Sequence, residues 1–134
     1  MPISRIVIVL ALAALAPLAG CATTSTLPGG SSDMLAGLHG GLISGEIGQG
    51  LSKAARQRVL VAEFNALESG LSAPPVTWSD AASGLSGEIS AGTPYRVGSQ
   101  DCRPYVLTVV RAGSPSRSVG AACRDETGIW VRAA

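Results

Sequence analysis

The tetrapeptide Leu18-Ala19-Gly20-Cys21 constrains the fold most, because it predicts where the mature chain begins. Small residues at Ala19 and Gly20 suit a signal-peptidase pocket, and a branched residue at Leu18 is typical of the bacterial lipobox. The thiol of Cys21 would then be the group that accepts a diacylglyceryl chain. We therefore expect the folded part of the protein to lie within residues 21–134.

Residues 1–20 have the pattern of a lipoprotein signal peptide. One positive charge at Arg5 precedes the uninterrupted apolar run 6–16 and then the small residues. The alternative is a transmembrane helix, for which the apolar run is only just long enough. The position of Cys21 favours processing, after which acyl chains would hold the protein to a membrane. Ala22 replaces the aspartate that retains lipoproteins at the inner membrane, so we expect the outer membrane, with the side that the domain faces left open.

The cysteines and charges bound the mature chain further. If Cys21 is acylated, Cys102 and Cys123 remain as a pair that an oxidising periplasm would let form a disulfide. Ten basic residues less Arg5 leave nine against nine acidic ones, without a basic patch. This balance gives no support to nucleic-acid binding. The length suits one small domain plus a tether.

The mature chain opens with two segments of low complexity. Residues 21–33 are predicted to be a flexible tether rich in Thr, Ser, Pro and Gly. Residues 34–50, the Gly-rich segment, fit two descriptions. As a helix after Asp33, they would carry two rows of small residues able to contact a membrane or self-associate, in the manner of a glycine zipper: Gly37, Gly41 and Gly45, and Ala36, Gly40, Ser44 and Gly48. As a flexible linker, they would stay non-helical, because each Gly destabilises a helix by about 1 kcal/mol relative to Ala.

Residues 51–134 are predicted to form an α+β domain. Residues 52–69 have a helical pattern, with Ser52 as the N-cap and Gly70 as the stop. An apolar stripe is expected to pack this amphipathic helix against a sheet, although partner binding is an alternative: Leu60, Phe64, Leu67 and Leu71. After Ala73-Pro74-Pro75 the pattern alternates, which predicts a small antiparallel β-meander with strands at 76–79, 85–90, 95–97, 103–111, 117–124 and 128–132.

The strand at 103–111 is apolar on both faces, which predicts a central place in the sheet. The following turn is expected at Gly113–Ser116. If the turn spans 112–116, Cys123 faces Tyr105 and not Cys102, so the disulfide would need a bulge near Pro104 or Gly120.

A spaced pattern of Cys, Arg, Gly and Trp marks the second half of the chain. It runs Cys102-Arg103, then Gly120-Ala121-Ala122-Cys123-Arg124, Gly128 and Trp130, with Trp78, Gly84, Gly87 and Tyr95 ahead of it. In this pattern the chain resembles the bacterial 17 kDa surface antigen lipoproteins, and the helix, lipobox and Gly-rich segment are similar too. The resemblance implies an outer-membrane lipoprotein recognised as an antigen, and it implies no catalytic residues.

Little in the sequence points to chemistry. The one histidine, His39, lies in the Gly-rich segment, so neither a nucleophile–base pair nor a zinc site is expected, and no cofactor is implied. The two tryptophans, Trp78 and Trp130, could stack on a sugar but are more often core residues. The acidic residues of the domain are interpreted as solvated charges on turns and outward faces: Asp80, Glu88, Asp101, Asp125 and Glu126.

These observations favour a non-enzymatic lipoprotein with a structural or interaction role in the cell envelope, held to the membrane by lipid on Cys21. The alternative is a periplasmic or surface binding module that uses Arg and Trp on the sheet. Its ligand would be a glycan, peptidoglycan or a protein such as a lysozyme.

Overall fold

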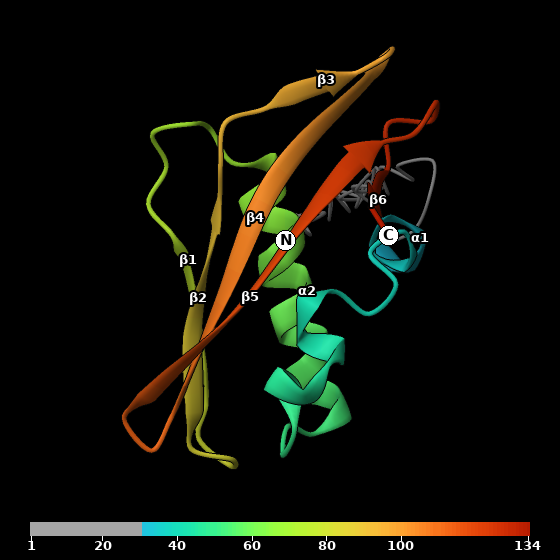
Figure 1. The fold of residues 1–134 in the computed structure, drawn as a ribbon. Helices are drawn as coiled ribbons and strands as arrows, with labels where there is room; N and C mark the ends of the chain where they lie inside the picture. Colours follow the sequence, from blue (N-terminus) through green and yellow to red (C-terminus); the bar gives the residue numbers. More distant parts are fainter. Residues whose placement is uncertain (1–30) are drawn as a thin grey trace, which may run out of the picture.

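The structure, a computed structural model, describes residues 31–134 (Figure 1). The predicted signal peptide, the lipobox with Cys21 and most of the predicted tether lie outside these residues. Within the described part no helix combines the length and apolarity needed to cross a bilayer. The elements are α1 (Ser31–Ala36), the 3-10 turns η1 (Leu42–Ser44) and η2 (Glu46–Gly48), α2 (Lys53–Glu68), β1 (Val76–Asp80), β2 (Leu85–Ala91), β3 (Tyr95–Val97), β4 (Gln100–Arg111), β5 (Ser114–Arg124) and β6 (Trp130–Arg132).

The strands form one antiparallel sheet in the order β1-β2-β4-β5-β6, and β3 pairs with β4 beyond the end of β2. Figure 1 shows α2 along one face of this twisted sheet, with α1 beside β6. The predicted α+β class is therefore confirmed. The central place of β4 is confirmed too, since β2 and β3 pair with one of its edges and β5 with the other.

Helix α2 begins as its sequence predicts but ends differently. The Ser52 hydroxyl accepts a 3.1 Å hydrogen bond from the N–H of Ala55, which makes Ser52 the N-cap. At the other end the chain leaves through an extended Ser69, and Gly70 does not adopt the left-handed conformation of a glycine stop. The prediction for Gly70 was wrong because, as described below, an arginine side chain satisfies the last carbonyl groups of the helix instead.

The buried face of α2 is wider and richer in small residues than the predicted stripe. Leu60 and Leu67 are buried as expected, but Phe64 is only half-buried. Leu71 was wrongly placed in the stripe, since it lies beyond the helix and is 68% exposed. The remaining buried positions include four residues that the prediction left outside the stripe: Ala55, Val59, Ala62 and Ala66.

The core lies between α2 and the inner face of the sheet. Along β4 the side chains alternate as predicted, with Tyr105, Leu107 and Val109 buried and the intervening residues only half-buried. On β2, Leu85 and Ile89 face the same core. The opposite face of the sheet carries no helix of the described chain (Figure 1).

The turn between β4 and β5 is shorter than predicted. Arg111 pairs with Ser114, so only Ala112 and Gly113 connect the strands, and both have positive φ, at 47° and 79°. Two left-handed residues are the geometry of tight hairpin turns. The predicted turn at Gly113–Ser116 was therefore wrong, because Ser114–Ser116 already belong to the strand. The shorter turn shifts the register of β5 by enough to remove any need for a bulge.

The Gly-rich segment is neither the single helix nor the linker that its sequence allowed. Helix α1 ends at Ala36, and positive φ values at His39, Gly40 and Gly41 prevent a continuous helix. The chain then folds back along α2 through η1 and η2. Its apolar side chains join the core beneath the sheet: Leu35, Leu38, Leu42 and Ile43.

Candidate functional site

The paired cysteines lie where the β4–β5 hairpin opens. Cys102 and Cys123 are directly opposite each other and form a disulfide. Cys102 is fully buried. The two longest strands are thus joined at both ends, by the Ala112–Gly113 turn and by this bond. The disulfide expected from the cysteine count is present, and its role in the structure is to hold the sheet.

Arg103, the residue after the first cysteine, is buried beneath the end of α2 with only 5% of its surface exposed. Its guanidinium donates hydrogen bonds to the carbonyl groups of Leu67, at 2.8 Å, and of Ser69. Its Nε donates to the carbonyl of Gly92 at 3.0 Å. A cation at a helix C-terminus is favourable because the unpaired carbonyls and the helix dipole are negative there. Arg103 therefore ties α2 to β4 and to the loop after β2.

Arg124, the residue after the second cysteine, belongs to a second cluster, which joins β5 and β6 to the end of α2. Its guanidinium lies 4.3 Å from the ring centroid of Trp130 and 2.8 Å from the Glu68 carboxylate. The same Glu68 oxygen accepts a 2.7 Å hydrogen bond from the indole N–H of Trp130. A second bond from Arg124 reaches the carbonyl of Gly128 at 2.7 Å. These contacts fix β6 against the end of α2.

The turn before β6 is organised by Asp125. Its carboxylate accepts hydrogen bonds from the Thr127 hydroxyl at 2.6 Å and from the Ile129 N–H at 3.0 Å. These bonds, that of the Thr127 hydroxyl foremost, hold the pKa of Asp125 below its ordinary value. The cysteines, arginines and tryptophan of the motif, from Cys102 to Trp130, thus make contacts that hold the sheet and α2 together.

Glu63 is the residue that the sequence analysis missed. It lies in the middle of α2 with none of its surface exposed. Its two carboxylate oxygens accept backbone N–H bonds from Leu42, at 2.9 Å, and from Ile43, at 3.2 Å. Burial raises the pKa of Glu63, and these two bonds partly oppose that rise. The available signal was its position four residues after Val59 and four before Leu67, inside the buried face.

Two further side chains surround Glu63. Burial and the nearby negative charge of Glu63 raise the pKa of Tyr105. The Tyr105 hydroxyl lies near the Glu63 carboxylate and lowers its pKa. Among the described residues, however, this hydroxyl has no partner in hydrogen-bond geometry. Arg132 of β6 donates a 2.8 Å bond to the carbonyl of Gly41 and supplies the positive charge of the cluster. The cluster therefore fastens the Gly-rich segment to both α2 and β6.

Asp80 corrects the prediction that the acidic residues of the domain are solvated. It is 6% exposed and forms a 2.9 Å ion pair with Arg58 of α2. Its other oxygen accepts the N–H of Ser83 at 3.2 Å. The bonds from Ser83 and the charge of Arg58 lower the pKa of Asp80. Of the other predicted carboxylates, Glu88, Asp101 and Glu126 are exposed as expected, and Asp125 is half-buried.

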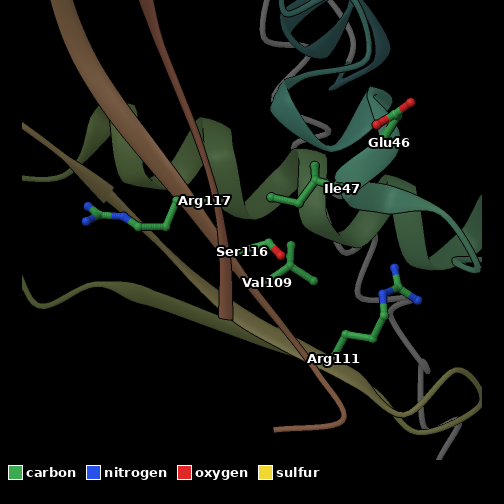
Figure 2. Close-up of a pocket in the computed structure, with 6 residues that line it drawn as sticks. All are labelled: Glu46, Ile47, Val109, Arg111, Ser116 and Arg117. Carbon is green, nitrogen blue, oxygen red and sulfur yellow. The ribbon is translucent and has the colours of Figure 1, made fainter. Parts of the chain in front are cut away.

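A hollow of about 290 Å³ lies between η2 and the β4–β5 hairpin (Figure 2). Figure 2 shows the Arg117 side chain leaving β5 on the side opposite to Ile47 and Arg111. Arg111 already donates a 2.6 Å bond to the carbonyl of Gln49. Ser116 adds one polar side chain from the sheet, and Figure 2 shows the Glu46 carboxylate of η2 directed away from it. The hollow consequently lacks the converging polar groups of a ligand site.

The remaining candidates for chemistry are not brought together. His39 is exposed, in a tight turn of the Gly-rich segment. Trp130 is 3% exposed, and Trp78 is half-buried and packs against the core from β1, so neither ring is fully exposed as a platform for a sugar. No group of three or more His, Cys, Asp or Glu side chains suited to a metal gathers within residues 31–134.

Comparisons with known proteins agree with the spacing of the motif. A family model described as 17 kDa outer membrane surface antigen matches residues 65–131. A protein named 17 kDa surface antigen from Rickettsia bellii (strain RML369-C) is 31% identical over 86 residues, which cover 63% of this chain and 54% of that protein. Another of the same name, from Rickettsia felis (strain ATCC VR-1525 / URRWXCal2), is 32% identical over 82 residues, covering 60% and 52%. The chain spans about half the length of these curated relatives. No solved structure matches it.

Proposed function

Because the chain belongs to the 17 kDa outer membrane surface antigen family, we propose that it is a non-enzymatic lipoprotein of the outer membrane, acylated at Cys21. Its domain would have a structural or interaction role in the cell envelope. The names of the relatives support a surface or membrane-associated location. The sequence Leu18-Ala19-Gly20 before Cys21 supports lipid anchoring.

The observation that carries the proposal is the use of the motif residues. Arg103 binds the end of α2, and Arg124 binds Glu68 beside Trp130. A catalytic or ligand-binding arginine would point its guanidinium into a cleft, where it could meet a substrate. Here both guanidinium groups are satisfied by the chain's own carbonyl and carboxylate oxygens. The polar groups of the motif therefore stabilise the fold, and the folded domain would provide a surface for display or contact.

Replacement of Cys21 tests the anchoring. Wild-type protein produced in bacteria with radiolabelled palmitate should carry label, sediment with membranes and have the mass of residues 21–134 plus acyl chains. Cys21→Ser should lose the label and the processed mass, because serine lacks the thiol that accepts the lipid. Ala22→Ser places the same side chain one residue later and should behave as wild type. An unlabelled wild-type protein, or a Cys21→Ser protein of unchanged mass and location, would refute the proposal.

The side of the membrane that the domain faces is tested separately. Protease is added to intact cells and to lysed cells, and cleavage after residue 51 is followed. Cleavage on intact cells would place the domain outside and favour antigen or host-contact roles. Protection until lysis would place it in the periplasm and favour contact with envelope components.

A further inference from the structure

The face of the sheet that α2 leaves uncovered has an unusual composition. We call it the open face. It consists of the residues that alternate with the buried ones on the three central strands: Ser86, Glu88 and Ser90 of β2, Pro104, Val106, Thr108 and Val110 of β4, and Pro115, Arg117, Val119 and Ala121 of β5. The described helices all lie on the other side of the sheet (Figure 1).

The centre of the open face is apolar. Val106 and Val110 lie on β4, and beside them Val119 is 70% exposed. A solvated face of an antiparallel sheet normally alternates with polar residues. Charged groups are confined to Glu88 and Arg117. An apolar centre with few charges is the composition of the core of a protein–protein interface.

The two charged residues occupy one row across the strands. Glu88 is paired with Thr108, and Thr108 is paired with Arg117. Neighbouring strands are about 4.8 Å apart, so the two charges lie roughly 10 Å from each other, on either side of Thr108. Neither forms an ion pair or a side-chain hydrogen bond within residues 31–134. Figure 2 shows the Arg117 side chain directed away from the hollow on the inner side.

From this row we infer that the open face binds a second copy of this chain, face to face, about a two-fold axis that runs parallel to β4, above Thr108 and midway between the two sheets. Such an axis exchanges the two sides of β4. It therefore sets Glu88 of each copy against Arg117 of the other, while Val106 and Val110 meet their own equivalents. A two-fold axis along the row would oppose Glu88 to Glu88 and Arg117 to Arg117. The charges thus select the axis along the strand, which is also the aligned packing of two sheets.

The size of the open face predicts a weak dimer. At the usual strand spacing and rise, the two copies would bury on the order of 1,000 Å² in total, which lies in the range of transient interfaces. Dimerisation would therefore be reversible and dependent on concentration. The inference concerns only the folded domain and does not depend on acylation of Cys21.

Crosslinking of the full chain in bacterial membranes with a short bis-maleimide tests the axis, because facing sheets lie about 10 Å apart, too far for a direct disulfide. Thr108→Cys places a thiol next to the two-fold axis, whereas Thr77→Cys makes the same change in the same row, on β1, where the pairing with Glu88 sets it two strands away. After treatment with the crosslinker and a denaturing gel, Thr108→Cys should give a crosslinked dimer, and Thr77→Cys and the wild type should not. Equal crosslinking of both variants, or none by Thr108→Cys, would overturn the inference. A dimer of the wild type itself would instead report a free Cys21 and count against the proposed anchoring.

Charge reversal in the Thr108→Cys background tests the pairing. Glu88→Arg and Arg117→Glu should each lower the yield of dimer by about ten-fold, because each opposes like charges twice in the symmetric pair. The double reversal should restore the yield. Both side chains are exposed, so the fold should survive all three changes. Single reversals that leave the yield unchanged, or a double reversal that fails to restore it, would overturn the arrangement.

Discussion

Glu63, in the middle of α2, accepts a 2.9 Å hydrogen bond from the backbone N–H of Leu42, twenty-one residues earlier in the chain. A second bond, from Ile43, reaches its other oxygen at 3.2 Å. A buried carboxylate is costly unless its oxygens are satisfied. Here backbone groups of the Gly-rich segment satisfy them, so this one side chain determines how that segment packs on the helix.

Glu63 should make stability fall as the pH rises above 4.5, the ordinary pKa of a glutamate. Burial raises its pKa in the folded state, so above 4.5 the unfolded chain releases a proton that the folded chain keeps. The contribution of Glu63 is therefore complete below 4.5 and is lost as the pH rises through the folded pKa. Glu63→Gln cannot ionise, and it should gain stability relative to wild type over this range.

Urea unfolding of both proteins at a series of pH values measures this difference. Asp80 and Asp125 do not interfere with this measurement, because their pKa values are lowered. Their contribution to stability is lost only below pH 3.8, as the pH falls through their folded pKa values. Below pH 4.5 Glu63→Ala should cost about 3 kcal/mol, since both N–H groups lose their acceptors, and this cost should shrink as the pH rises. A difference between wild type and Glu63→Gln that stays constant with pH would contradict the assignment.

Two glycines of the same predicted row should respond differently to alanine. Gly41 has a φ of 71°, and a Cβ there would collide with the Glu63 carboxylate, so Gly41→Ala should cost about 3 kcal/mol. Gly45 has a φ of −81° and nothing within 4 Å of the Cβ position. Gly45→Ala should therefore change the unfolding free energy by less than about 0.5 kcal/mol. Equal effects in thermal unfolding would favour the glycine-zipper description instead.

Removal of the Arg103 side chain should loosen the end of α2. Arg103→Ala leaves the carbonyls of Leu67 and Ser69 without a donor, and we expect a loss of about 3 kcal/mol in urea unfolding. Arg103→Lys keeps the charge but lacks the planar fork, so its loss should be about half as large. Arg96→Ala is the control, because the ion pair of Arg96 with Asp101 is exposed on both sides. An Arg103→Ala protein as stable as the control would disprove the capping role.

Loss of the disulfide should lower the free energy of unfolding by about 3 kcal/mol, the value expected for a closed loop of this length. Cys102 and Cys123 are 21 residues apart in the chain. The double variant Cys102→Ala with Cys123→Ala should match wild type treated with reductant, and reductant should not affect the double variant. Wild type that is indifferent to reductant would show that the bond contributes nothing to stability.

The sequence was informative where a local rule decides the structure. Ser52 begins α2 because its hydroxyl caps the helix, and the alternation of β4 identifies its buried face. The register of β5 could not be predicted, since Ala112 gives little sign of the left-handed conformation that it adopts. Once that turn is known, Cys102 falls opposite Cys123 without further assumption.

For the candidate site, by contrast, the sequence revealed the residues but not the contacts that they make. The motif identified Arg103 and Arg124 but not their partners, because the carbonyls of α2 and the Glu68 carboxylate come close only in the folded chain. The sequence did not reveal the role of Glu63, since the backbone groups that satisfy its carboxylate belong to a segment with no strong helical or strand pattern. Contacts between distant segments, rather than local preference, decide both cases.

Because the Gly-rich segment packs into the core, the smallest unit of this chain that can fold is longer than the family match. The family match begins at residue 65, yet nine of the eighteen buried residues of the hydrophobic core within residues 31–134 come earlier in the chain, among them Leu38, Leu42, Val59 and Leu60. A gene fragment trimmed to the match would encode β1 to β5 and most of β6, with much of the apolar inner face of the sheet left uncovered. Residues 31–134 must therefore be transferred, expressed or used as an immunogen as one piece.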